Sequence, residues 1–176
     1  LVKAKFNSDE EIFEMNNGCI CCTVRSDLVA ILTKISKRSD RLDGIVIETT
    51  GLADPAPVAQ TFFVDEAMKE FARLDGIITL VDAMHIEQHL DEEKPEGAEN
   101  EAVDQVAYAD RMLLNKVDLV GEADLERVER RLRSINRFAP IERCRRSSVA
   151  VDSVRDSRGF DLARTLEMDP HFLDGG

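Results

Sequence analysis

The sequence predicts an α/β fold with a mostly parallel sheet. Compact apolar runs end in polar residues or a glycine, and the segments between these runs carry apolar residues at three- and four-residue spacing. Strands that alternate with helices in this way are typical of a parallel sheet covered by helices on both faces. With 176 residues, 43% of them apolar, the chain can bury one substantial core, so one domain is expected.

The first predicted helix begins at Thr23, which has a side chain able to cap it. Its apolar residues recur on one helical face: Val24, Leu28, Ile31, Leu32 and Ile35. The run Ile45 to Ile47 in GIVIETTG is then expected to form a buried strand that feeds a loop at Gly51. Pro55 and Pro57 follow and begin the next helix.

Two further strands are predicted from Ile77 to Val81, ending at Asp82, and from Met112 to Leu114, ending at Asn115. An acidic loop, DEEKPEGAEN, and a helical pattern lie between them, which gives the order strand, helix, strand. The helical pattern comprises Ala102, Val103, Val106 and Ala107.

The last predicted elements are a helix and a short strand. The helix contains Leu125, Val128, Leu132 and Ile135, and the strand lies in PIERCRR. We interpret residues 1–168 as one domain and residues 169–176 as a link toward a carboxyl-terminal domain. Ligands of parallel sheets bind beyond the carboxyl ends of the strands, so Glu48, Asp82 and Asn115 mark the expected site.

Charge and hydropathy exclude several partners. The 35 acidic side chains outnumber the 23 basic ones, which disfavours binding to nucleic acid, because such binding depends on clustered Lys and Arg. No apolar run approaches the roughly 18 residues of a membrane helix, and no charged-then-apolar leader opens the chain. A cytoplasmic protein without a membrane partner is therefore expected.

The motif NKVD predicts a guanine-binding site. Asn115, Lys116 and Asp118 have the N-K-x-D spacing, in which the carboxylate accepts hydrogen bonds from guanine N1 and N2 while the lysine stem lies along the base. Adenine would leave this carboxylate without a partner, so the motif selects guanine. The alternative is a polar surface turn, but the position of the motif between a strand and a helix favours the functional interpretation.

The motif IETTG predicts a phosphate-hydrolysing element. Glu48 at a strand end is suited to hold a water ligand of magnesium, and Gly51 lets a backbone N–H approach the terminal phosphate. A strand-terminal glutamate followed by a turn glycine is the alternative, which becomes the weaker one beside N-K-x-D.

The three thiols of Cys19, Cys21 and Cys22 predict a metal site. Thiolates suit zinc and copper(I), and three of them leave the fourth position of a tetrahedral ion open for transfer. The dipole of the helix that begins at Thr23 is expected to lower the pKa values of these thiols. Cys144 is distant from them and is expected to be a small buried apolar residue.

The histidines carry less weight. His85 and His89 have a spacing that can hold a metal, but no third ligand is near in the sequence, so a solvated helix face is the preferred interpretation. His171 is interpreted as incidental.

Together these motifs resemble the CobW-type P-loop GTPases that act as metal chaperones or metal-insertion factors. The resemblance covers nearly the whole chain, and C-x-C-C, E-T-T-G and N-K-x-D in this order are highly specific for it. It implies a three-layer P-loop NTPase-like domain, here incomplete at the amino-terminal end. It also implies slow GTP hydrolysis coupled to delivery of zinc, or of cobalt or iron, to a client metalloprotein.

The resemblance also assigns a role to each group of candidate site residues. It makes Cys19, Cys21 and Cys22 the metal ligands, Glu48 and Gly51 the catalytic element for Mg²⁺ and the γ-phosphate, and Asn115, Lys116 and Asp118 the base readers. The family's phosphate loop, G-x-x-x-x-G-K-[ST], has no counterpart, because no glycine in the chain is followed by lysine. The chain alone is therefore expected to be inactive.

Two other classes of function remain open. A metal-binding or regulatory fragment would retain the thiols without GTPase activity. A redox thiol protein would favour C-x-x-C over C-x-C-C.

Overall fold

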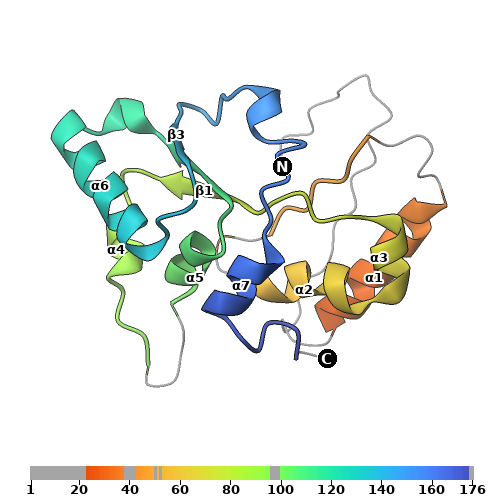
Figure 1. Cartoon of the computed structure of the whole chain (residues 1–176). Coiled ribbons are helices and arrows are strands. Elements are labelled where there is room, and N and C mark those ends of the chain that lie inside the picture. The colour runs from red at the N-terminus through yellow and green to blue at the C-terminus, as the bar shows by residue number, and fades with distance from the viewer. Residues whose placement is uncertain (1–22, 38–42, 50, 52, 96–99, 175–176) are drawn as a thin grey trace.

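The computed structural model describes residues 23–37, 43–49, 51, 53–95 and 100–174. In this part of the chain the sheet has three parallel strands in the order β1-β2-β3, which are β1 (Ile78–Asp82), β2 (Arg111–Asn115) and β3 (Ile141–Arg143). Figure 1 shows α4 and α6 near these strands and α1, α2 and α3 gathered at the other end of the molecule. The predicted parallel α/β sheet is confirmed.

The register aligns β1 and β2 from end to end. Ile78 pairs with Arg111 and Asp82 pairs with Asn115. Side chains of a strand alternate between the two faces of a sheet, so Val81, Met112 and Leu114 share one face, and all three are buried. The carboxyl ends of β1 and β2 therefore meet at one edge of the sheet.

The main hydrophobic core lies between this face and three helices: α4 (Ile86–Leu90), α5 (Glu101–Ala107) and α6 (Glu122–Ile135). Apolar residues of α6 recur at helical spacing, and Leu125, Val128 and Leu132 are buried. Asn100 caps the helix α5, because its side-chain oxygen accepts hydrogen bonds from the N–H groups of Ala102 and Val103. Capping and burial together explain why these segments are helical.

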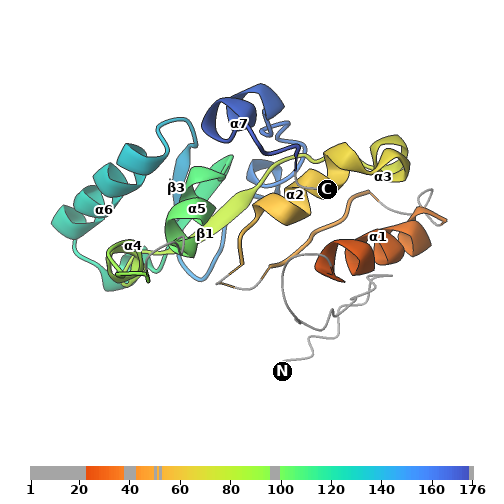
Figure 2. The ribbon, with the colours of Figure 1, turned by 90° about the horizontal axis from the view of Figure 1, so that it is seen from below.

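A second core joins α1 (Thr23–Ser36), α2 (Ala56–Val64) and α3 (Glu66–Phe71). Leu28, Leu32, Phe62 and Met68 pack together in it. Asp65 separates α2 from α3, because its extended backbone ends the first helix and its carboxylate accepts a hydrogen bond from the N–H of Met68. Figure 2 shows α1 below α2 and α3 in that view, away from the sheet.

The carboxyl-terminal part packs against α2. After β3 the chain passes through η3 (Val151–Ser153) to α7 (Leu162–Met168), and Phe172 beyond that helix is fully buried. The ring of Phe63 stacks on Phe160 with a centroid distance of 5.1 Å, and Phe172 contacts both rings. These contacts form a third cluster with Ala56 and Ala59.

The predicted strand from Ile45 to Ile47 is wrong. Residues 44–49 form no helix or strand, and the exposed fraction of Val46 is 96%. An apolar run becomes a buried strand only when another strand pairs with it and a second layer covers it. No strand in the described part of the chain pairs with this segment.

The expected cover of both sheet faces is partial. Leu113, on the face opposite the main core, is buried, but Ile78 and Leu80 of β1 are 42% and 56% exposed. Both side chains lie on the strand that forms one edge of the sheet within the described residues. The exposed fractions show that this face is open at β1.

The other predicted elements are mostly confirmed. Helices occur at 23–36, 56–64, 101–107 and 122–135, and the short last strand spans 141–143. The helices α3 and α7 and the short η2 (Val117–Leu119) were not expected from the sequence. No helix in the described ranges is long and apolar enough to span a membrane.

Candidate functional site

The candidate site is built on the carboxyl ends of β1 and β2. Asp82 and Asn115 are the last residues of these strands and are partners in the sheet. Beyond them the N–H of Ala83 still donates to the carbonyl oxygen of Asn115 at 3.0 Å, and the N–H of Val117 donates to the carbonyl oxygen of Cys144 at 3.5 Å. The turn at residues 115–117 is thus held from both neighbouring segments.

Asn115 fixes the loop that follows β3. Its carboxamide oxygen accepts the N–H of Ser147 at 2.9 Å, and its nitrogen donates to the Ser147 hydroxyl at 3.2 Å. Arg146 and Ser147 both have positive φ, 52° and 55°, a conformation that is uncommon for residues with a side chain. The double contact therefore joins the motif on β2 to a sharply turned loop.

Lys116 projects from β2 toward the end of β1. Its backbone is left-handed, with φ 63°, and its Nζ donates to Asp82 Oδ2 at 2.6 Å. Asp82 also accepts the N–H of Met84 at 3.0 Å, and the Nδ1 of His85 lies 2.9 Å from Oδ2. Three residues converge on this carboxylate: Lys116, which directly follows β2, and Met84 and His85 in the turn after β1.

These contacts determine the pKa of Asp82. Burial raises the pKa of this carboxyl, but the hydrogen bonds from Lys116, His85 and the Met84 N–H outweigh burial and lower it from 3.8 to about 2. Asp82 is therefore a carboxylate at neutral pH, which makes it a permanent partner for the Lys116 ammonium.

Asp118 lies on η2 and is exposed. Among the described residues it has no ion pair and its side chain accepts no hydrogen bond. Its carboxylate is therefore available to accept hydrogen bonds from two adjacent N–H donors of a ligand. The structure thus places all three N-K-x-D residues in one turn, with Asn115 and Lys116 held by the protein and Asp118 free.

Glu48 and Gly51 lie on a separate segment. Glu48 is exposed and has no hydrogen bond or ion pair within the described ranges. The side-chain amide of Gln105, on α5, donates to the carbonyl oxygens of Gly51 at 3.2 Å and Ala53 at 2.9 Å. A Cβ on Gly51 would meet no atom within 4 Å, so packing alone does not require glycine there.

The predicted metal ligands Cys19, Cys21 and Cys22 lie outside the described residues. Within those residues no group of three His, Cys, Asp or Glu side chains is arranged to hold a metal ion. Cys144 is buried, and burial raises the pKa of its thiol. This environment agrees with the expected apolar role of Cys144.

Two cavities lie beside other elements. One, of about 400 Å³, lies between the end of α6 and α7, and its lining includes Tyr108, Phe138 and Arg164. A smaller one, of about 210 Å³, lies between α4 and α6 and includes Met84 and Asp124 in its lining. Neither cavity is lined by a residue of the N-K-x-D motif.

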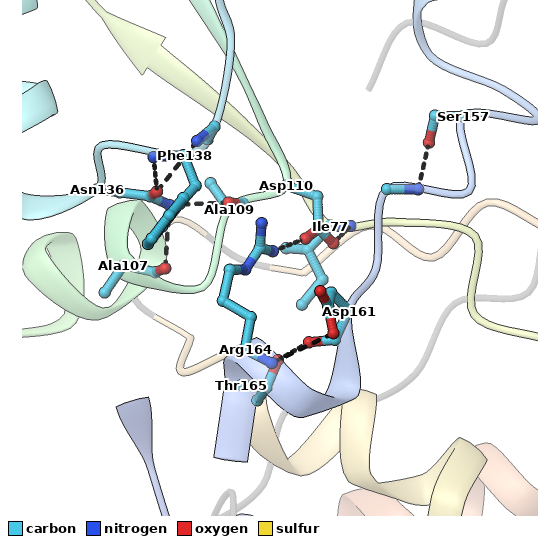
Figure 3. Close-up of polar contacts among 12 residues, drawn as sticks. Ile77, Ala107, Ala109, Asp110, Asn136, Phe138, Ser157, Asp161, Arg164 and Thr165 are labelled. Atoms are coloured by element: carbon cyan, nitrogen blue, oxygen red, sulfur yellow. Dashed lines mark hydrogen bonds and ion pairs between the residues drawn. The ribbon is translucent and has the colours of Figure 1, made fainter. Parts of the chain in front are cut away.

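A buried polar network stabilises the opposite, amino-terminal edge of the sheet (Figure 3). Asp110, whose side chain is 3% exposed, pairs with Arg164 of α7 and accepts the N–H of Ile77 at 2.8 Å. Asn136 donates to the carbonyl oxygens of Val106, Ala107 and Ala109 at 2.8 to 3.1 Å. This network anchors the loops before β1 and β2 and leaves the carboxyl edge as the candidate ligand site.

Two members of the candidate site, Ser147 and His85, were not predicted from the sequence. Ser147 carries no sequence signal, because its role depends on a loop that folds back onto Asn115. His85 was interpreted as part of a solvated face, yet its ring contacts Asp82. The available sequence signal for the contacts around Asp82 was the expectation that Asp82 and Asn115 both lie at the carboxyl ends of strands.

The chain is similar to several known proteins. The zinc-regulated GTPase metalloprotein activator 1 of Schizosaccharomyces pombe is 41% identical over 136 residues, which are 75% of this chain and 32% of that protein. The zinc chaperone YjiA of Escherichia coli is 37% identical over 89% of this chain and 48% of its own length. The crystal structure of Zn(II)-bound YjiA GTPase matches 76% of this chain and 40% of that chain, with a TM-score of 0.64 and 36% identity.

These relatives are longer than this chain, which spans about a third to a half of their lengths. The agreement with the YjiA structure extends the fold assignment to P-loop NTPases. The sequence-family model described as CobW/HypB/UreG, nucleotide-binding domain, matches residues 2–143. This chain therefore belongs to the CobW/HypB/UreG family of nucleotide-binding domains.

Proposed function

We propose that the chain is the nucleotide- and metal-binding part of a GTP-dependent zinc chaperone. The observation that carries the proposal is the turn after β2, where Asn115 and Lys116 are held in place and the Asp118 carboxylate is free. A free carboxylate next to an anchored lysine suits guanine, which offers two adjacent N–H donors and a flat surface for the lysine stem. The names of the relatives, which include zinc-regulated GTPases and zinc chaperones, support the same class.

The proposed phosphate and magnesium element is the segment of Glu48 and Gly51. A carboxylate suits Mg²⁺, which prefers oxygen ligands and usually keeps several waters, and Glu48 is exposed with no competing cation among the described residues. When bound, Mg²⁺ would neutralise charge on the terminal phosphates. Gln105 of α5 donates to the carbonyl oxygen of Gly51, so α5 would keep the segment around Gly51 close to the main core.

The proposed cargo is zinc, bound by Cys19, Cys21 and Cys22. Three thiolates and an open fourth position suit an ion that has to be passed to a client metalloprotein. These cysteines directly precede α1, and that helix packs on α2 and α3. Reordering of the segments around α1 by the nucleotide would change zinc affinity, which is the linkage that a chaperone needs.

Zinc and GTP measurements on one sample distinguish this function from its alternatives. Zinc content and GTP binding are measured on the reduced chain before and after the other ligand is added. One zinc per chain, with an affinity that changes when GTP is present, supports the chaperone. Zinc binding that is indifferent to GTP indicates a metal-binding fragment, and a reversible disulfide without zinc uptake indicates a redox thiol protein.

A further inference from the structure

We propose that Asp82 is a positioning residue of the guanine site, which anchors Lys116 and thereby keeps Asp118 free for the base. The inference deepens the proposed function and rests on it for its consequence in nucleotide binding. It assigns a role to the strand-end carboxylate that lies next to the N-K-x-D motif but outside it.

The contact between Asp82 and Lys116 joins two strands. Lys116 Nζ lies 2.6 Å from Asp82 Oδ2; Asp82 is the last residue of β1, and Lys116 directly follows β2. The carboxylate itself is held, because the N–H of Met84 donates to Oδ1 and the His85 ring contacts Oδ2. A fixed acceptor at the end of β1 fixes the direction of the lysine stem.

The backbone of Lys116 supports the same orientation. Its left-handed conformation is uncommon for a residue with a long side chain. The N–H of Leu119 donates to the carbonyl oxygen of Lys116 at 3.0 Å, and the N–H of Ala83 holds the preceding carbonyl group. With both ends of the lysine constrained, its methylene groups form a defined surface on which a planar base can lie.

The pairing also keeps the oxygens of Asp118, the guanine reader, available for the base. Lys116 precedes Asp118 by two residues, and both side chains are exposed. Without Asp82 the ammonium would have Asp118 as a nearby carboxylate to pair with. Such a pair would occupy the oxygens that guanine N1 and N2 need, so the site would lose its preference for guanine.

The first experiment measures the anchor without any nucleotide. The chain is treated with acetic anhydride, and the acetylation rate of each lysine is followed by peptide mass spectrometry. The substitution Asp82→Asn is made in an Asp118→Asn chain, so that Asp118 cannot replace Asp82 as the partner of Lys116. It is expected to speed acetylation of Lys116 by roughly two- to five-fold, the range that corresponds to an exposed ion pair. Asp82→Glu retains the charge and is expected to restore most of the protection.

Internal and matched controls separate positioning from folding. Lys69 and Lys94 pair with other carboxylates and should keep their rates in Asp82→Asn, whereas partial unfolding would speed both. Glu87→Gln breaks a surface ion pair with Arg127 on the neighbouring helix and should leave Lys116 unchanged. An unchanged Lys116 rate when Asp82→Asn is added to Asp118→Asn overturns the proposal.

The second experiment measures base preference. Millimolar GTP and ATP are titrated into the ¹⁵N-labelled chain, and their dissociation constants are read from amide shifts. The ratio that favours GTP is expected to fall in Asp82→Asn and to survive in Glu87→Gln. A faster Lys116 rate with an unchanged GTP-to-ATP ratio overturns the role of Asp82 in base reading. If the wild-type chain prefers neither nucleotide, the proposed function fails, and the acetylation rates alone decide whether Asp82 anchors Lys116.

Discussion

Both polar side-chain atoms of Asn115 form hydrogen bonds with Ser147. The carboxamide oxygen accepts the Ser147 N–H at 2.9 Å, and the nitrogen donates to the Ser147 hydroxyl at 3.2 Å. One amide hydrogen remains for a ligand. The first residue of the N-K-x-D motif therefore has a structural role, since it connects the end of β2 to the loop that follows β3.

Replacing Asn115 with Ala is expected to release this loop. The variant loses both contacts, and the exposed Ser147 N–H turns to water instead, so a loss of about 0.5–1.5 kcal/mol per hydrogen bond in the free energy of unfolding is expected. Ser147→Ala removes only the hydroxyl contact and should cost less. Urea unfolding gives both values, and an equal loss in the two variants would contradict the role of the Ser147 N–H.

Replacing Asp118 with Asn is expected to change base preference from guanine to xanthine. The amide keeps an acceptor for N1–H but presents a donor where guanine N2 also donates, and this donor suits the C2 carbonyl of xanthine. A charged hydrogen bond contributes about 1.5–3 kcal/mol, so the ratio of affinities for GTP and xanthosine triphosphate should shift by about ten-fold or more. Amide shifts during titration give the ratio.

The matched control for this change is Asp152→Asn, which also removes an exposed carboxylate. Asp152 lies on η3 and pairs with Arg155, which follows that helix. Its nucleotide ratio should equal that of the wild type. If Asp118→Asn behaves like this control, Asp118 does not read the base.

Removing Arg164 is expected to destabilise the chain strongly. Asp110 is almost fully buried, and burial raises the pKa of its carboxyl in spite of the Ile77 N–H and the Arg164 guanidinium that favour the charged form. Arg164→Ala leaves this carboxylate without its cation, at an expected cost of about 3–5 kcal/mol. Arg155→Ala breaks an exposed pair and should cost under about 1 kcal/mol.

A double variant tests the cause. Asp110→Asn removes the charge that needs Arg164, so Arg164→Ala should cost less in that background than in the wild type. Denaturant unfolding of the four proteins at pH 7 gives the coupling. Equal costs in the two backgrounds would show that Arg164 stabilises α7 by packing and not through Asp110.

The sequence predicted the parts of the fold whose pattern is local. Leu125, Val128 and Leu132 reveal α6 because helical spacing alone places them on one face. The run at Val46 has an equally strong apolar signal, yet a strand needs partners far away in the chain, and this one has none in the described ranges. The turn residues of the site were identifiable because N-K-x-D is continuous, whereas Ser147 reaches Asn115 only through tertiary folding.

The zinc site is tested by serine substitution. Replacing Cys19, Cys21 and Cys22 together is expected to abolish stoichiometric zinc binding by the reduced chain, because the hydroxyl of serine is a poor zinc ligand at neutral pH. Cys144→Ser should leave zinc binding intact, since that thiol is buried and burial raises its pKa. Metal analysis after gel filtration gives the stoichiometry, and equal zinc content in the triple variant would contradict the assignment.

The chain, as printed, is expected to bind GTP weakly and not to hydrolyse it measurably. Most of the affinity of P-loop sites comes from backbone N–H groups and a lysine around the β- and γ-phosphates, with a Ser or Thr hydroxyl on magnesium. The chain contains no G-K-[ST] sequence to supply them. The base contacts contribute about 0.5–1.5 kcal/mol each, or about 1.5–3 when charged, against an association cost of at least about 4 kcal/mol. The few contacts that Lys116 and Asp118 can make therefore leave little net affinity. Calorimetric titration of GTP with magnesium, together with a phosphate-release assay, measures both properties. Micromolar binding with turnover would show that other residues of this chain form a phosphate cradle, and the exposed segment around Glu48 would be the first place to seek it.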